Sequence, residues 1–252
     1  MARPRTYKSE GIILKGIPLG EADRIVTIYT LGSGKLSLVA KGVRRSRSRM
    51  SGYLEPLTYV SISVAEGRNI DTITEVEIIQ SFREIREDLL LVSKGLYFAE
   101  IVDKFTVDRS PGSAEFKLLF DGLGILKASY TTDLALRYFE MQMLKITGFG
   151  PEIYQCVECH TELEVDSHGF SNLKGGILGS ECRSKSSEST AAISVGAIKL
   201  LRYLQNESYD RVMGLNIPEV LLVDVEKLLG SYIRYVLDKK IKSKEFIGLI
   251  SS

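Results

Sequence analysis

Six Lys or Arg residues lie within fifteen positions near the N-terminus, and no acidic residue stands among them. Residues 1–49 carry a net charge of +8, whereas the whole chain is +1, so residues 50–252 sum to −7. A clustered positive charge is typical of a surface that binds the phosphates of a nucleic acid. The candidate phosphate contacts are Lys35, Lys41, Arg44, Arg45, Arg47 and Arg49, with Arg24 as a weaker candidate.

Two plainer interpretations of these bases stay open at this point. A basic run can be a solvated, flexible loop with no ligand, and Arg24 can pair with its neighbours Glu21 or Asp23 instead of a phosphate. The surrounding pattern of strands, described below, favours the binding surface over the plain loop.

Cysteines form the second group of residues that could do chemistry. Cys156 and Cys159 have the C-x2-C spacing with which two thiolates bind one zinc ion. A second pair should follow, and Cys182 stands at one of its positions, but the residue three places earlier is Gly179. The chain therefore offers three thiols for four ligand positions.

A histidine could complete a Cys3His zinc site. His168 is the better candidate because it lies between the two half-sites, while His160 directly follows Cys159 and has less freedom. The alternative is a degenerate zinc-finger-like segment that folds without metal. Zinc is thus an expected cofactor only if the site is completed, and the sequence predicts weak, substoichiometric binding.

The elements that position these residues change type along the chain. Residues 6–80 are rich in β-branched residues and turn signals, which predicts five strands and a long basic loop after the third. This pattern suits a small OB-fold barrel. Four tyrosines on this module could stack on exposed bases or be half-buried barrel residues: Tyr7, Tyr29, Tyr53 and Tyr59.

Beyond residue 80 the apolar residues recur at helical spacing. Residues 152–190 interrupt this pattern, and Pro218 is well placed to begin a last long helix. We therefore predict an α+β protein with an OB-fold domain over 1–80 and an all-helical domain over 81–252. A small zinc-finger-like insertion over 152–190 interrupts the helical domain.

The remaining chemistry of the chain excludes several classes of protein. No apolar run approaches the ~20 residues that a membrane span needs, and the N-terminus lacks the apolar stretch of a signal peptide. We therefore expect a cytoplasmic protein with no membrane partner. No complete nucleophile, acid–base or phosphate-loop set is present, so we expect no enzyme.

Short motifs run through the chain in a fixed order. They are Gly11-Ile-Ile-Leu, Gly20-Glu-Ala-Asp-Arg-Ile-Val-Thr27, Gly34-Lys-Leu36, Ala40-Lys-Gly-Val-Arg-Arg45, Leu54-Glu-Pro-Leu57, Gly148-Phe-Gly-Pro151, Cys156-x2-Cys159 and Gly175-Gly-Ile-Leu. In these motifs the chain resembles the bacterial RecO family of recombination mediators. Gly179 departs from the pattern, since zinc-bearing relatives have Cys there.

The resemblance implies a non-enzymatic role in repair by homologous recombination, in the bacterial cytoplasm and at the nucleoid. Such proteins bind single- and double-stranded DNA, anneal complementary strands and act with RecR. Together they help RecA displace single-strand-binding protein. Two rival functions remain: an OB-fold module that binds RNA, and a metal- or thiol-dependent enzyme built on the Cys/His region.

Overall fold

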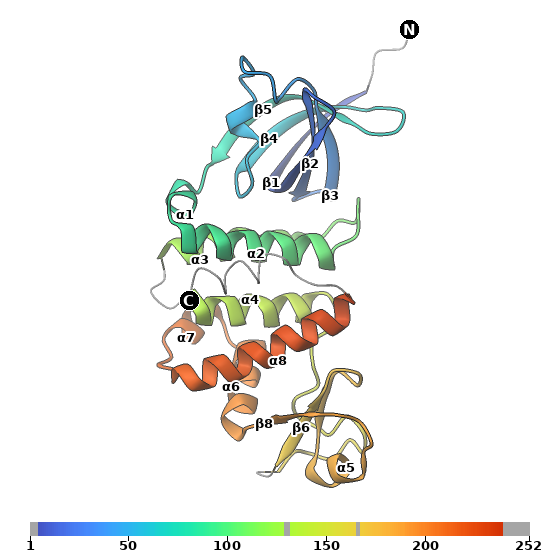
Figure 1. Cartoon of the computed structure of the whole chain (residues 1–252), viewed down its shortest axis with the longest axis vertical. Coiled ribbons are helices and arrows are strands. Elements are labelled where there is room, and N and C mark those ends of the chain that lie inside the picture. Colours follow the sequence, from blue (N-terminus) through green and yellow to red (C-terminus); the bar gives the residue numbers. More distant parts are fainter. Residues whose placement is uncertain (1–4, 129–131, 165–166, 239–252) are drawn as a thin grey trace. The chain divides into compact units, whose positions relative to one another are not determined.

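The computed structural model describes residues 5–128, 132–164 and 167–238. Contacts group them into two compact units, one reaching Ala128 and the other comprising 132–238, here called the N-terminal and C-terminal units (Figure 1). The predicted α+β class is confirmed, with a five-stranded N-terminal sheet and a helical C-terminal region. The helical residues 83–128 pack with the sheet and belong to the N-terminal unit.

Five strands of the N-terminal unit close into a barrel in the order β1-β2-β3-β5-β4. All neighbours are antiparallel except β3 and β5, which are parallel and pair only at Val39 and Thr72. The strands are β1 (Thr6–Leu19), β2 (Asp23–Thr30), β3 (Gly34–Ala40), β4 (Tyr59–Ala65) and β5 (Thr72–Gln80).

The barrel forms because its strands alternate buried and exposed positions. In β4, Val60, Ile62 and Val64 point into the core while their neighbours are partly exposed. Gly11 of β1 lies where that strand has both β4 and β2 as partners, and a Cβ there would stand 2.6 Å from Ile28 and 2.7 Å from the Tyr29 carbonyl oxygen. The first motif glycine is therefore needed for close strand approach.

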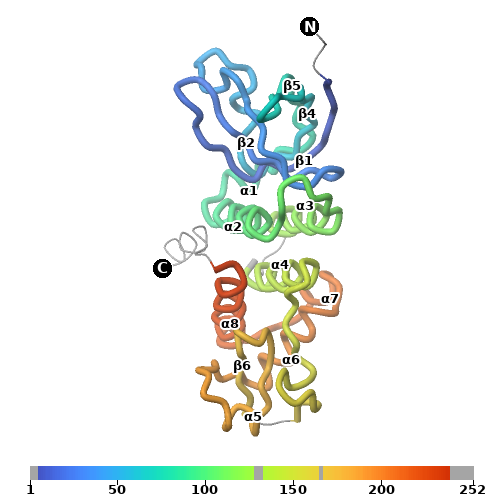
Figure 2. Tube along the Cα trace, turned by 90° about the vertical axis from the view of Figure 1, so that its right-hand side faces the viewer, coloured from blue at the N-terminus to red at the C-terminus, as the bar shows by residue number. Residues whose placement is uncertain are grey.

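Three helices, α1 (Arg83–Glu87), α2 (Leu89–Phe105) and α3 (Ser113–Ala128), cover one end of this barrel (Figures 1 and 2). The Asp88 side chain begins α2 by accepting hydrogen bonds from two backbone N–H groups of its first turn. Tyr59 of β4 packs edge-on against Phe116 and Phe120 of α3. The short 3-10 helix η1 (Ser51–Tyr53) lies between the basic loop and β4.

In the C-terminal unit, four helices pack together: α4 (Thr132–Ile146), α6 (Val195–Asn206), α7 (Tyr209–Met213) and α8 (Glu219–Leu237). Pro218 is the N-cap of α8, as the sequence predicted. A three-stranded sheet in the order β7-β6-β8 interrupts the helices. It consists of β6 (His168–Ser171), β7 (Gly176–Leu178) and β8 (Ala191–Ile193), with α5 (Ser180–Lys185) between β7 and β8.

The Gly175-Gly176 pair explains how this small sheet is built. Gly175 has a left-handed φ of +69° at the turn into β7, a conformation that favours glycine. A Cβ on Gly176 would stand 2.4 Å from the Glu152 carbonyl oxygen, and Glu152 exchanges backbone hydrogen bonds with Gly175 and Ile177. The motif glycines thus serve backbone packing. None of the described helices combines the length and the apolar character that a membrane span requires.

Candidate functional site

The basic loop, residues 41–50, joins β3 to η1 at the end of the barrel away from α1–α3 (Figures 1 and 2). It is a series of tight turns, with backbone bonds from Arg45 N–H to the Gly42 carbonyl and from Ser48 N–H to the Arg45 carbonyl. Val43 is 1% exposed and belongs to the barrel core. The loop is therefore held in one shape by the barrel beneath it.

The β1–β2 turn holds the basic loop from the other side. The Gly42 N–H donates to a carboxylate oxygen of Asp23 at 2.7 Å, and the Arg44 N–H donates to the Ala22 carbonyl at 2.9 Å. Gly20 and Gly42 both have left-handed φ angles, +59° and +66°. The motif Gly20-Glu-Ala-Asp and the motif Ala40-Lys-Gly thus meet in space and shape the same loop.

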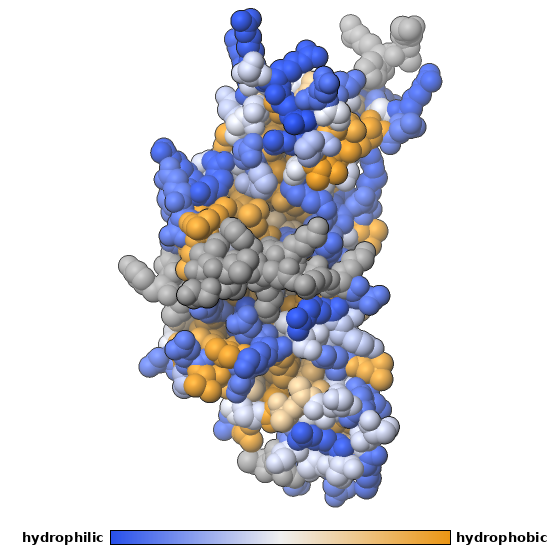
Figure 3. Space-filling model, in the orientation of Figure 1, coloured by the Kyte–Doolittle hydropathy of each residue, from blue (hydrophilic) through white to orange (hydrophobic). Residues whose placement is uncertain are grey.

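Positive charge on the basic loop is exposed and unpaired. Arg44 donates to the Gly20 carbonyl oxygen at 2.8 Å, which fixes its guanidinium without neutralising it. Over the described ranges 5–128, 132–164 and 167–238, none of the loop's basic side chains forms an ion pair with an acid. Figure 3 shows hydrophilic side chains gathered over this end of the barrel. The exposed bases are Lys41, Arg44, Arg45, Arg47 and Arg49.

Arg24 supports the loop region and has a different partner from either one expected. Its guanidinium lies 3.2 Å from Glu55 and 3.5 Å from the Leu54 carbonyl oxygen. The expected partner Asp23 is engaged by Gly42. Arg24 thus joins β2 to the Leu54-Glu55 turn, in the segment that follows the basic loop.

Lys35 lies at the opposite end of the barrel from the basic loop. Its ammonium donates to the carbonyl oxygens of Asp103 and Thr106 at 2.7 and 2.8 Å, at the C-terminus of α2. The side chain is 12% exposed and lies within 4 Å of the carboxylates of Asp103 and Asp108. A cation here complements the helix C-terminus. The structure therefore separates Lys35 from the other candidate bases.

The segment 106–112, here called the strap, lies along the start of β3, where β5 does not pair with it. The Arg109 N–H donates to the Lys35 carbonyl at 2.8 Å, and the Arg109 guanidinium pairs with Asp71 at 2.8 Å. Hydrogen bonds from the Gly67 N–H, the Arg109 guanidinium and the Tyr7 hydroxyl lower the pKa of Asp71. The cation of the strap, Arg109, is therefore paired with an acid.

The four candidate tyrosines fall into two groups. Tyr29 is 1% exposed and its hydroxyl donates to the Gly112 carbonyl of the strap, while Tyr7 donates to Asp71. Burial and a hydrogen bond to Glu10 raise the pKa of Tyr59 to about 12. Tyr53 is 43% exposed and belongs to η1, directly after the basic loop. Tyr53 is therefore the tyrosine that is best placed to stack on a base.

The cysteine cluster is the second candidate site. The sulfur atoms of Cys156, Cys159 and Cys182 lie within 4.8 Å of one another, and all three thiols are free. Cys156 is buried and accepts a hydrogen bond from the Gly179 N–H at 3.3 Å. The turn between the first two cysteines closes on His160, whose φ of +59° makes it a turn residue.

The thiols of this cluster have unequal acidities. Hydrogen bonds to the Thr161 hydroxyl and backbone lower the pKa of Cys159 to about 7, whereas hydrogen bonding to Cys159 and desolvation raise the pKa of Cys182 to about 12. Cys159 is thus the first of the two thiols to ionise, and its negative charge makes ionisation of Cys182 harder. A bound cation would remove this penalty.

His168, the expected fourth ligand, does not join the three sulfurs. It is a buried residue of β6, and its Nε2 lies 2.6 Å from the Glu164 carbonyl oxygen. A cavity of about 480 Å³ borders His168, Cys159, Gly179 and Cys182. The donor set therefore does not fit a closed four-ligand structural zinc site.

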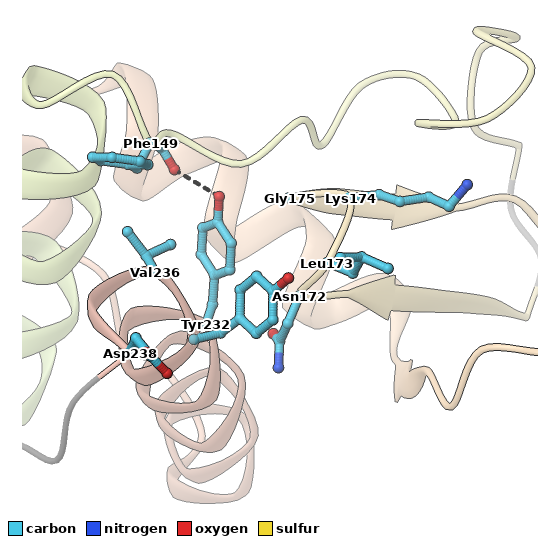
Figure 4. Close-up of a pocket in the computed structure, with 9 residues that line it drawn as sticks. Phe149, Asn172, Leu173, Lys174, Gly175, Tyr232, Val236 and Asp238 are labelled. Carbon is cyan, nitrogen blue, oxygen red and sulfur yellow. Dashed lines mark hydrogen bonds between the residues drawn. The ribbon is translucent and has the colours of Figure 1, made fainter.

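A separate cavity of about 560 Å³ lies beside the C-terminal end of α8 (Figure 4). Tyr232 crosses it and donates from its hydroxyl to the Phe149 carbonyl at 3.0 Å. Asn172 and Lys174 come from the β6–β7 turn, and Lys174 is already paired with Glu158. The cavity is aromatic and lacks the free cations of the basic loop among its lining residues.

Comparison with known proteins connects these features. A family model described as "Recombination protein O N terminal" matches residues 1–82, and one described as "Recombination protein O C terminal" matches residues 86–245. A protein of Dehalococcoides mccartyi named "DNA repair protein RecO" is 35% identical over 251 residues, covering 100% of this chain and 98% of its own.

Other relatives with the same name are nearly as similar. A protein of a Roseiflexus species is 33% identical over 97% of this chain and 86% of its own length. A protein of Desulforamulus reducens is 31% identical over 96% of this chain and 94% of its own. The similarity therefore covers the basic loop and the cysteine cluster together.

Proposed function

Because the chain belongs to the RecO family of DNA repair proteins, we propose that it is a DNA-binding recombination mediator that binds and anneals DNA strands. The observation that carries this proposal is the basic loop: five exposed bases with no acidic partner among the described residues, held in one shape by Val43, Asp23 and the β1–β2 turn. A strand order of β1-β2-β3-β5-β4 with a parallel β3–β5 pair supports an OB-fold for the barrel.

Annealing requires electrostatics more than bond chemistry. Two strands repel each other through their phosphates, and a fixed basic surface that contacts both lowers this repulsion. Guanidinium groups suit the task because they stay charged and present several donors in one plane. Affinity gained in this way falls with salt as condensed counterions are released.

The proposed partners follow from the family. They are single- and double-stranded DNA, RecR, single-strand-binding protein and, indirectly, RecA, in the cytoplasm and at the nucleoid. The protein would act without catalysing a reaction, by helping RecA replace single-strand-binding protein on DNA. DNA contacts are assigned to Lys41, Arg44, Arg45, Arg47 and Arg49. Lys35 is instead assigned to the contact between β3 and the strap, and Arg24 to the support of the basic loop.

Salt-dependent DNA binding tests this proposal. Replacing Arg44, Arg45, Arg47 and Arg49 with Ala should weaken binding to all DNA sequences alike. The slope of log affinity against log salt should become shallower by about 0.7–0.9 for each phosphate that the protein no longer neutralises. Annealing of complementary strands without ATP should slow in parallel.

A matched control removes the same charge elsewhere. Arg83, Lys117, Lys185 and Arg211 are exposed helix residues in ion pairs with an acid four residues away. Their fourfold Ala variant should keep the wild-type slope. Equal losses in both variants would show that net charge matters and that the loop does not. Tighter binding to RNA than to DNA, measured on matched oligonucleotides, would favour the RNA-binding alternative.

A further inference from the structure

The last residues of β1 expose three apolar side chains in a row, here called the apolar ridge. Ile17 is 52% exposed and Leu19 is 41% exposed, and Pro18 between them is exposed as well. A single exposed apolar residue is ordinary on a protein surface, whereas contiguous exposed apolar residues are typical of interaction sites. The ridge therefore needs a partner that its own barrel does not supply.

The apolar ridge is held in a fixed position by β2. Its three residues pair in register with Ile25, Arg24 and Asp23. A Cβ on Gly16 would stand 2.6 Å from the Arg24 side chain, so the two strands approach closely just before the ridge. Arg24 in turn contacts Glu55. The ridge is thus part of the barrel framework, and its side chains stay at the surface.

The apolar ridge leads directly into a turn that contacts the basic loop (Figure 2). In this turn, the Gly20 carbonyl accepts from the Arg44 guanidinium at 2.8 Å, and the Ala22 carbonyl accepts from the Arg44 N–H at 2.9 Å. Asp23, at the end of the turn, accepts from the Gly42 N–H. A ligand that covers the ridge and reaches the loop should therefore combine apolar surface with negative charge.

The edge of β1 argues against a peptide that would add a strand here. Pairing between β1 and β4 ends at Ile12, so residues 15–19 have β2 as their one strand partner among the described residues. Pro18 has no N–H to donate, and proline is a common means by which a sheet edge resists an added strand. A nucleic acid needs no such backbone pairing, because its bases offer apolar faces and its phosphates carry the charge.

We propose that the apolar ridge is a wedge that unstacks the bases of a DNA strand while the basic loop holds the phosphates of that strand. This inference rests on the DNA binding proposed above. Proteins that deform DNA insert apolar side chains between base steps, and isoleucine, leucine and proline are among those they use. In this chain, bases separated by the ridge are free to meet a complementary strand, because stacking within the first strand is already broken.

Fluorescence of 2-aminopurine reports the unstacking on the full chain, since this base analogue is quenched when it is stacked. Saturating wild-type protein should raise the fluorescence of a single-stranded oligodeoxyadenylate that carries one 2-aminopurine in its middle. Ile17→Thr combined with Leu19→Thr keeps every charge and suits a strand. This variant should lose most of the fluorescence rise, bind single strands about fivefold more weakly and keep the wild-type salt slope.

The matched control combines Leu89→Thr with Val107→Thr, two exposed apolar residues outside the ridge and the basic loop. It should behave as wild type, with circular dichroism checking the fold of each variant. If the double ridge variant does not fold, the single variant Leu19→Gln, at the exposed end of β1, should still lose part of the rise.

Three results would overturn the wedge. They are wild-type binding without a fluorescence rise, a folded ridge variant that keeps the full rise, and an equal loss in the control variant. A ridge variant that keeps the rise but no longer self-associates as wild type does in sedimentation would make the ridge a contact between copies of this chain. Wild-type protein that shows no salt-dependent binding to the oligonucleotide would instead contradict the proposed DNA-binding function, and the wedge with it.

Discussion

Lys35 and Lys41 lie at the two ends of one strand and have opposite surroundings. Lys35, near the start of β3, donates to two helix carbonyls and contacts two carboxylates, with 12% of its side chain exposed. Lys41 follows the last residue of β3, is exposed, and belongs to a loop whose bases have no acidic partner in the part of the chain that the structure describes. Both belong to the same acid-free basic run, yet one stabilises the fold and the other is free to bind.

The contrast extends to the strap and the basic loop. Where the strap contacts the barrel, charges and tyrosine hydroxyls are paired: Arg109 and Tyr7 with Asp71, and Tyr29 with Gly112. In the basic loop, the Asp23 carboxylate and the Ala22 carbonyl accept hydrogen bonds from backbone N–H groups, and the cationic side chains stay exposed. In the basic loop, the hydrogen bonds that fix the backbone come from groups other than the cationic side chains. These cations therefore remain available to a ligand.

Of the changes considered, replacing Lys35 or Lys41 singly should have the largest effects, on unfolding free energy and on DNA binding respectively. Lys35→Met keeps the aliphatic stem but leaves the Asp103 and Thr106 carbonyls without their donor, so we expect a loss of about 2–3 kcal/mol in unfolding free energy. Lys41→Met should leave stability within about 0.5 kcal/mol and make the DNA salt slope shallower by about 0.7–0.9.

Thermal unfolding and salt-dependent DNA binding, measured on both variants, check this pair of expectations. The wild-type chain is the common reference, and each variant serves as the control for the other. A Lys35→Met protein with normal stability and a shallower salt slope would place Lys35 among the DNA contacts and remove the contrast between the two ends.

Replacing the tyrosines should have smaller effects than replacing the lysines, and these effects should appear in DNA affinity. Tyr53→Ala removes an exposed ring beside the basic loop, and we expect single-stranded DNA to bind about 1–2 kcal/mol more weakly, because base stacking on an aromatic ring contributes that much. Affinity for duplex DNA, whose bases are already stacked, should change little.

Tyr29→Phe is the matched control at the strap. It loses one hydrogen bond to Gly112 but keeps a buried ring, so DNA affinity should equal that of wild type. Fluorescence anisotropy with single-stranded and duplex oligonucleotides measures both variants. Unchanged single-strand affinity in Tyr53→Ala would show that the loop binds through charge alone.

The smallest effect should appear as a pH dependence of stability. The pKa of Asp71 is lowered below its usual 3.8, so its contribution to stability is fully present above about pH 4 and is lost as the pH falls through the lower folded-state pKa. Asp71→Asn should be less stable than wild type at neutral pH, and the two stability curves should converge in acid. Curves that stay parallel below pH 4 would show that the negative charge of Asp71, which accepts from Gly67, Arg109 and Tyr7, adds nothing to stability.

Local patterns were sufficient to predict much of the fold. Alternating apolar residues predicted the five strands, helical spacing predicted the C-terminal helices, and Pro218 predicted the start of α8. The loop that follows β3 was also placed correctly, since a basic run between two strand patterns must form a connection. The sequence did not predict that Asp23 and Gly42, which lie in separate motifs, contact each other and shape this loop.

Side-chain partners could not be predicted in the same way. Lys35 was grouped with Arg44 because they are near in sequence, but its partners are 68 to 73 residues away in the chain. Arg24 has Glu55 as its partner, not an adjacent acid. His168 was chosen as a ligand from its position between the cysteines, yet its strand directs it to the Glu164 carbonyl.

By itself, the sequence determined which residue types were available: a concentrated positive charge, three thiols and a glycine where a fourth thiol would complete the set. It also determined the local elements, because backbone periodicity is a property of neighbouring residues. Tertiary structure alone decided which cations are paired and which are free, and that the three sulfurs meet. The physical reason is that hydrogen bonds and ion pairs depend on distances of a few ångströms, which closure of the barrel and the small sheet sets between residues far apart in the chain.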